Sequence, residues 1–282
     1  FELDSSYNAS VSTKKYVDFT TLLNQTDNEA TVYQYYDSSN SNSVGLITGS
    51  TQLSEYAFTL QGEFIFPNKD EQDTLSYLTP AVVSSSLFGF HTPSDASPTS
   101  TNAVKSPGEF AEVVSPLSRV KDAYFVVKDR VGNTLLTSDT FRNVYENERW
   151  NLSLTLKPKK YPFSDGVLDS SVSSTGYELG LYGVNFDTGI KQNYFNITTD
   201  LTYASGSDII NSAKRVYIGA HRTNFTGSTD TFTDVRASST RYWTDYFSPS
   251  VLDLQAKQID THGSLHPSRN SYLFQTASAG VY

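Results

Sequence analysis

Two glutamates, Glu146 and Glu148, stand two positions apart just before Trp150. At strand spacing both side chains fall on one face, and a pair of carboxylates is what the hydrolysis of a glycosidic bond requires. No third carboxylate accompanies them, so the simpler interpretation is a polar approach to a strand. The alternative is the atypical acid pair of a carbohydrate-active enzyme, either a glycoside hydrolase or a lyase.

Other catalytic and metal-binding chemistries are disfavoured by the composition. The chain contains no cysteine, which excludes disulfides, thiolate metal sites and cysteine nucleophiles. Of its four histidines, only His262 and His266 have i,i+4 spacing, and Gly263 and Pro267 argue against a helix there. We find no Gly-x-Ser-x-Gly elbow, phosphate-binding loop or dinucleotide-binding motif.

Tyrosine, with 19 copies, offers a different chemistry, because an exposed aromatic ring beside polar side chains can stack on a sugar. Two groups are candidates: three tyrosines directly precede the polar segment 37–42, and two lie on either side of Trp243. The competing interpretation is that most tyrosines of a β-sandwich pack half-buried, and we assign Trp150 and Trp243 to the core. The candidate carbohydrate-binding residues are Tyr33, Tyr35, Tyr36, Tyr242 and Tyr246.

The elements that must position these residues are mostly strands. Polar and apolar side chains alternate over 58–66, 152–156 and 177–184, which is typical of strands with one face on a core. Shorter apolar runs at 123–127 and 216–218 predict central strands. Ser248, as N-cap, followed by Pro249 predicts the one short helix. The fold class is therefore an antiparallel all-β sandwich with a short C-terminal helix.

Composition bounds the organisation and the partners. The net charge of −9 disfavours nucleic acid, and no apolar run reaches the roughly 18 residues of a membrane span. The missing methionine predicts an internal module of a longer chain. We expect one domain at 16–260, an N-terminal flank at 1–15, and a C-terminal flank or linker at 261–282.

A series of short motifs runs through the second half of the chain. An Arg-Trp pair opens a strand at 149–156, and a tyrosine-rich strand and turn follow at 177–189. The series continues with Ile-Gly at 218–219, Phe-Thr-Gly at 225–227, Arg-Tyr-Trp at 241–243 and Ser-Pro at 248–249. This order resembles the laminin-G-like branch of the concanavalin A-like lectin/glucanase superfamily.

The resemblance implies a jelly-roll sandwich and two expectations about its chemistry. Glucanases of that superfamily carry a Glu-x-Asp-x-Glu motif, which is missing here, so we expect no enzyme. Laminin-G-like domains often bind calcium at the rim of the sandwich, although no cofactor is required. The calcium candidates that the resemblance implies are Asn185, Asp187, Asp230 and Asp234.

The leading functional hypothesis is a non-catalytic, lectin-like adhesion or assembly module of a larger virion protein, such as a phage tail, baseplate or capsid protein, or of an extracellular structural protein. Its partners would be other subunits of a multi-copy assembly and cell-surface glycans, with no nucleic acid and no membrane insertion. The alternatives are a carbohydrate-active enzyme of the same fold and a purely structural spacer.

Overall fold

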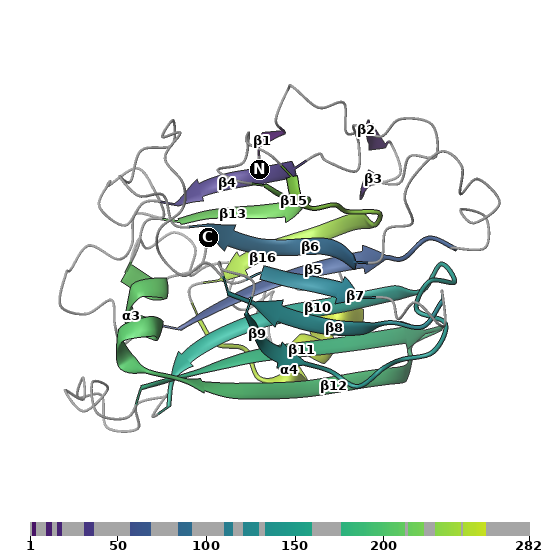
Figure 1. The fold of residues 1–282 in the computed structure, drawn as a ribbon. Coiled ribbons are helices and arrows are strands. Elements are labelled where there is room, and N and C mark those ends of the chain that lie inside the picture. The colour runs from purple at the N-terminus through teal and green to yellow at the C-terminus, as the bar shows by residue number, and fades with distance from the viewer. Residues whose placement is uncertain are drawn as a thin grey trace, which may run out of the picture.

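The computed structural model describes thirteen segments of the chain (Figure 1). The polar segment 37–42 and the predicted C-terminal flank at 261–282 lie outside the described residues. The described segments are 2–3, 10–12, 16–18, 31–36, 57–68, 84–91, 110–114, 121–129, 133–159, 176–211, 214–222, 229–243 and 245–257.

Two antiparallel sheets of seven strands each, together with a small hairpin of β14 (His221–Arg222) and β15 (Thr229–Thr231), form the molecule. The predicted all-β sandwich is confirmed. The first sheet, in order, contains β1 (Glu2–Leu3), β4 (Thr31–Tyr36), β13 (Lys214–Gly219), β6 (Ser84–His91), β7 (Phe110–Val114), β8 (Tyr124–Lys128) and β9 (Thr134–Thr137). The second contains β12 (Ile190–Leu201), β11 (Tyr177–Asp187), β10 (Arg149–Pro158), β5 (Phe58–Ile65), β16 (Arg236–Trp243), β3 (Tyr16–Asp18) and β2 (Ser10–Ser12).

The main core lies between the two sheets. Alternate residues of β5, β10 and β11 point into it, as the period-2 pattern predicts. Aromatic rings join the layers: Phe125 of the first sheet lies 5.0 Å from the Trp150 ring and 5.3 Å from the Phe195 ring of the second. Phe64 and Phe88 form a similar pair with ring centroids 5.4 Å apart.

The second sheet is also covered on its outer face, the face turned away from the first sheet. Helix α4 (Pro249–Lys257) packs there, behind β10 and β11 in Figure 1. Leu252 and Ala256 of the helix pack against Tyr182 and Val184 of β11. The strand β5 is consequently buried on both faces over almost its whole length, whereas the sequence pattern predicts only one buried face.

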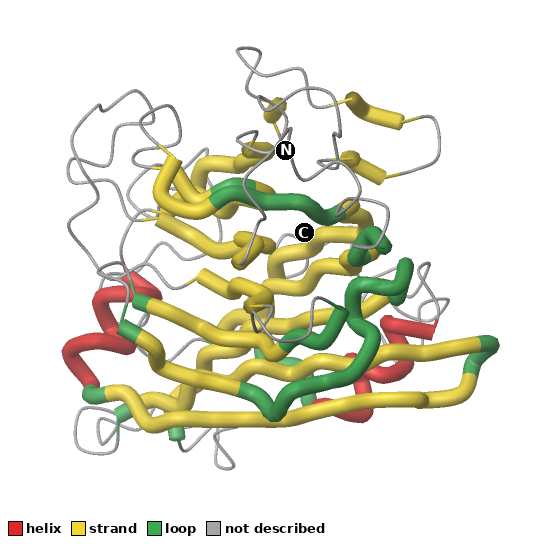
Figure 2. Tube along the Cα trace, turned by 45° about the vertical axis from the view of Figure 1, so that its right-hand side comes forward, coloured by secondary structure: helices red, strands yellow, loops and turns green. Residues whose placement is uncertain are grey.

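The two helices of the described segments, α3 and α4, lie apart from each other (red in Figure 2). Helix α4 confirms the predicted C-terminal helix. Helix α3 (Tyr203–Asn211) is one that the sequence analysis missed, and its N-cap is Thr202, whose Oγ1 accepts a hydrogen bond from the backbone N–H of Ser205. No helix within the described segments is long and apolar enough to span a bilayer.

The boundaries of the sandwich differ from the expected flanks at one end. Strands β1 and β2 belong to the predicted N-terminal flank, yet they pair with β4 and β3 at the edges of the two sheets.

A tight two-residue turn connects β11 and β12. Asp187 pairs with Ile190 across a two-residue turn, in which Thr188 and Gly189 both have positive φ, 48° and 83°. Positive φ at both turn residues matches the right-handed twist of the paired strands. The hairpin thereby fixes the register of the two longest strands.

The close approach of Phe195 to Gly183 gives a test of this packing. A Cβ atom at position 183 would lie 2.2 Å from Cε1 of Phe195 and 2.9 Å from Cδ2 of Leu152. Because both side chains are packed in the core, we expect Gly183→Ala to cost about 1–3 kcal/mol in urea unfolding. The matched control is Gly189→Asn, which has open space and a φ that Asn tolerates, and it should leave stability nearly unchanged. A Gly183→Ala protein as stable as the wild type would contradict this packing.

Candidate functional site

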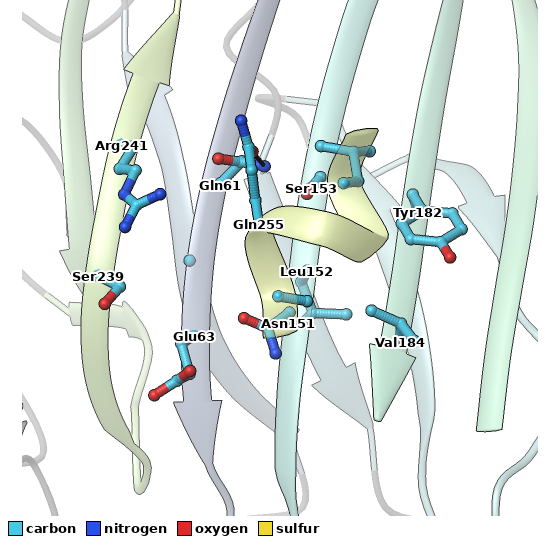
Figure 3. A pocket seen from close by; sticks show the side chains of 13 residues that line it. Gln61, Glu63, Asn151, Leu152, Ser153, Tyr182, Val184, Ser239, Arg241 and Gln255 are labelled. Atoms are coloured by element: carbon cyan, nitrogen blue, oxygen red, sulfur yellow. Dashed lines mark hydrogen bonds between the residues drawn. The ribbon is translucent and has the colours of Figure 1, made fainter. Parts of the chain in front are cut away.

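A solvent-open depression lies where α4 crosses the outer face of the second sheet (Figure 3). We call it the polar depression, because most of the side chains on its wall carry hydrogen-bonding groups. Its lining residues are Gln61, Gly62, Glu63, Asn151, Leu152, Ser153, Tyr182, Val184, Ser239, Arg241, Leu252, Gln255 and Ala256.

Two rows of side chains run across strands β16, β5, β10 and β11 at the base of the depression. Residues paired across neighbouring antiparallel strands point to the same face, so the strand register defines each row. The Glu63 row consists of Ser238, Glu63, Asn151 and Val184. The Gln61 row consists of Arg241, Gln61, Ser153 and Tyr182.

An amide network holds α4 to the sheet. The Nε2 group of Gln61 donates to Oε1 of Gln255, and Nε1 of Trp243 donates to Oε1 of Gln61 at 2.9 Å. All three side chains are buried. Trp243 is buried, as predicted, but it packs against Phe247 on the outer face and is not part of the cluster between the two sheets. The Nε2 group of Gln255 keeps no hydrogen-bond partner.

Glu63 places a carboxylate at the edge of the depression with only 5% of its side chain exposed. Its Oε1 accepts a hydrogen bond from Oγ of Ser238 at 2.8 Å. Its Oε2 lies 3.6 Å from Nε of Arg149, a side chain that is 42% exposed, and accepts no hydrogen bond. The Nδ2 group of Asn151, opposite Glu63 in the register, also has no partner.

A second cluster of polar side chains connects α4 to strands β11 and β12. The hydroxyl of Tyr182 donates to Oδ1 of Asp253, and Nζ of Lys191 lies 2.7 Å from Oδ2 of Asp253 and 3.0 Å from the Tyr182 hydroxyl. Burial, followed by the hydrogen bond to Asp253, raises the pKa of Tyr182 to about 12. Burial opposes the charge of Lys191, but its bonds to Asp253 and Tyr182 raise its pKa overall. At neutral pH the phenol is thus a donor and the ammonium a cation.

The predicted sugar-stacking tyrosines do not form one surface. Tyr33, Tyr35 and Tyr36 belong to β4 of the first sheet, and their side chains lie outside the described part of the chain. Tyr242 points into the core, where its ring stacks on Phe58 at 5.7 Å. Tyr246 is half-buried beside the outer face, with Nζ of Lys157 4.5 Å from its ring centre. Only Tyr246 remains near the polar depression's side of the sheet.

The predicted calcium ligands are also separated by the fold. Asn185 is buried and donates to Glu148 Oε2 and to the carbonyl of Arg149. Asp187 is exposed in the hairpin, and the side chain of Asp230 lies outside the described residues. Asp234 is buried and accepts from the Tyr145 hydroxyl at 3.0 Å. Within the described segments, no three His, Asp or Glu side chains come together as a metal-binding group, and calcium remains a prediction.

The two glutamates of the predicted acid pair have separate partners. Glu146 forms an exposed ion pair with Lys121 at 3.0 Å, and Glu148 accepts the hydrogen bond from Asn185 at 2.6 Å. Both lie at the turn before β10 rather than within the strand. Both carboxylates are therefore engaged in contacts that hold this turn.

The residues that line the polar depression were not predicted from the sequence. The strand alternation puts Gln61 and Glu63, and likewise Asn151 and Ser153, on the face opposite the core, and the pattern alone predicts that this face is turned to solvent. The signal that could have found the site is the helix directly after the Arg-Tyr-Trp strand. A helix in that place, carrying Gln255 among its apolar residues, has to cover one face of the sheet.

Comparisons with known proteins give likenesses in structure alone. No protein-family model matches the chain, and no curated protein sequence matches it. An alginate lyase from Pseudomonas aeruginosa aligns at 9% identity and a TM-score of 0.34, covering 69% of this chain and 67% of the lyase. The alginate lyase of Aplysia kurodai aligns at 8% and 0.30, covering 67% and 80%. The receptor-binding domain of botulinum neurotoxin type G aligns at 11% and 0.35, covering 73% of this chain and 38% of that one.

These matches correct one expectation. We predicted that the chain is not an enzyme because it lacks the Glu-x-Asp-x-Glu motif, but alginate lyases, which are enzymes, stand among its structural matches. The missing motif excludes one arrangement of catalytic carboxylates and no more.

The Tyr182 cluster predicts a pH dependence of stability. Because the folded-state pKa of Tyr182 lies near 12 against an ordinary value of 10, the folded chain binds its proton more tightly than the unfolded chain. The stability linked to this group is fully present below pH 10 and is lost as the pH rises toward 12. In urea unfolding across this range, Tyr182→Phe should lose less stability than the wild type. Part of the decline should remain, because burial also raises the pKa of Tyr145. Parallel pH curves for the two proteins would contradict the assignment.

Proposed function

We propose that this chain is a laminin-G-like jelly-roll module that binds carbohydrate and serves adhesion or assembly in a larger extracellular or virion structural protein. The observation that carries the proposal is the polar depression. Its wall combines three amides, a carboxylate, a guanidinium and two serine hydroxyls with the tyrosine ring of Tyr182.

Planar polar side chains suit a polyhydroxylated ligand. Each amide or carboxylate presents two hydrogen-bonding atoms at a fixed separation, and a sugar presents hydroxyl groups on adjacent ring carbons. A small number of such groups on a concave surface fixes the orientation of a ligand. The apolar residues of the same wall, Val184, Leu252 and Ala256, are buried against one another and hold the helix that forms one side of this surface.

Two features support the laminin-G-like part of the proposal. The architecture is a pair of seven-stranded antiparallel sheets, and α4 begins six residues after the end of β16, at the place where the resemblance expects a helix. Display in many copies on a surface would turn a weak individual contact into a strong total attachment.

The experiment is a binding assay on immobilised polysaccharides, with mannan, galactomannan and β-glucan as neutral probes and alginate and pectate as acidic ones. We expect the wild type to bind at least one of them. Asn151→Tyr, which places a large side chain in the depression, should abolish binding. The control is Asn193→Tyr at an exposed position of β12, and it should bind like the wild type.

The outcomes separate the proposed function from its rivals. Binding to none of the polysaccharides by a folded wild type overturns the proposal and favours a structural spacer. Binding that survives Asn151→Tyr leaves the module a carbohydrate binder with a different site. The bound polysaccharides are then examined for shortened chains, and turnover would replace adhesion by an enzymatic function.

A further inference from the structure

Within the polar depression, two unsatisfied groups face each other across one strand pair. Glu63 of β5 and Asn151 of β10 are direct partners in the antiparallel register. Such partners have Cβ atoms about 5 Å apart on the same face of the sheet. One atom of each, Oε2 of Glu63 and Nδ2 of Asn151, is buried and makes no hydrogen bond. The pair therefore presents one acceptor and one donor side by side.

We infer that Glu63 and Asn151 form a subsite for two adjacent hydroxyl groups of a neutral sugar ring, with Glu63 accepting from one hydroxyl and Asn151 donating to the other. This inference rests on the proposed carbohydrate binding and names its ligand chemistry. Gln255 contributes from the helix side of the depression, where its Nε2 is a second buried donor without a partner.

Burial makes these atoms energetically important. Glu63 and Gln255 are 5% and 6% exposed, and a buried polar atom without a hydrogen bond is rare in folded proteins and costly. The other oxygen of Glu63 accepts from Ser238, so Oε2, which lies 3.6 Å from Nε of Arg149 without a hydrogen bond, is the remaining acceptor. A hydroxyl that donates to this oxygen would form a charge-assisted hydrogen bond, which is stronger than a neutral one.

Because the pair offers one hydrogen-bond acceptor and one donor, it favours hydroxyl groups over charged ligands. At Oε2 of Glu63 an anion would meet a like charge, although Arg241 also lines the depression, and a cation would leave the amide donors of Asn151 and Gln255 unsatisfied while approaching Arg149. A metal ion needs several oxygen ligands, and Glu63 brings no second acidic side chain with it among the described residues. A hydroxyl group both donates and accepts, so two neighbouring hydroxyls satisfy the acceptor and the donor together.

The test uses methyl α-mannopyranoside, methyl α-glucopyranoside and methyl α-galactopyranoside with their monodeoxy analogues, measured by ligand-observed NMR titration. We expect at least one parent glycoside to bind the wild type. Glu63→Gln and Asn151→Ala should each weaken that binding about tenfold or more, because the first replaces a charged acceptor by a neutral one and the second removes the donor. The matched control is Glu178→Gln, which alters a carboxylate paired with Lys157 outside the depression and should bind like the wild type.

The deoxy analogues distinguish contact from a structural effect. The analogue that lacks the hydroxyl bound by Glu63 should bind the wild type about tenfold more weakly than its parent, and the loss should be clearly smaller in Glu63→Gln, whose neutral acceptor makes a weaker hydrogen bond. Equal losses in both proteins would overturn the inference, as would full affinity of Glu63→Gln and Asn151→Ala. In either case the chain would still bind carbohydrate, as proposed, but at a subsite other than Glu63 and Asn151. If none of the glycosides or polysaccharides binds the folded wild type, the proposed function itself fails.

Discussion

The arrangement of this molecule depends on one constraint, which is that a β-strand sends alternate side chains to opposite faces. In β5, β10 and β11 the large apolar residues take the face toward the first sheet, and the intervening positions fall on the outer face. Helix α4 then covers that outer face. Polar side chains that alternation alone would leave in solvent are thereby enclosed, and each needs a hydrogen-bond partner in place.

The helix contact divides into an apolar part and a polar part. Leu252 and Ala256 pack on Tyr182 and Val184, and the Tyr182–Asp253–Lys191 cluster ties the helix to β11 and β12. On the other side, the amide bond between Gln61 and Gln255 joins the helix to β5. The polar groups that remain unsatisfied are concentrated on the second side, around Glu63 and Asn151. The same helix that stabilises the sheet therefore creates a place where a hydroxylated ligand can complete the hydrogen bonding.

Most of the fold can be predicted from the sequence, but little of the candidate site can. Alternation over 58–66, 152–156 and 177–184 predicts strands because a sandwich core needs one continuous apolar face, and Ser248-Pro249 predicts α4 because caps act locally. Helix α3 was not predicted because the Ala-Ser-Gly-Ser segment at its start has weak helix propensity and its N-cap, Thr202, directly follows a long strand. The pairing of β5 with both β10 and β16 joins residues far apart in the chain, and no local pattern encodes it. Because this pairing cannot be predicted from the sequence, the proximity of Glu63, Asn151 and Arg241 could not be predicted either.

The tyrosines also show that residue type alone does not identify the residues of a site. Tyr242 is a plausible stacking residue by type, yet its position in β16 turns it toward Phe58 in the core. One position further, Trp243 faces outward and donates its indole N–H to Gln61. Residue type suggested the ligand class, and only strand register decided which side chains face the depression.

The central claim is that the polar depression binds the hydroxyl groups of a sugar, and the side-chain amide signals of Asn151 and Gln255 in a ¹H–¹⁵N NMR spectrum test it most directly. Titration with the neutral polysaccharide fragments that the chain binds should shift both NH₂ signals, together with the indole signal of Trp243, and leave the indole signal of the core residue Trp150 in place. Binding that leaves the amide signals of Asn151 and Gln255 unmoved, while other signals shift, would contradict the claim.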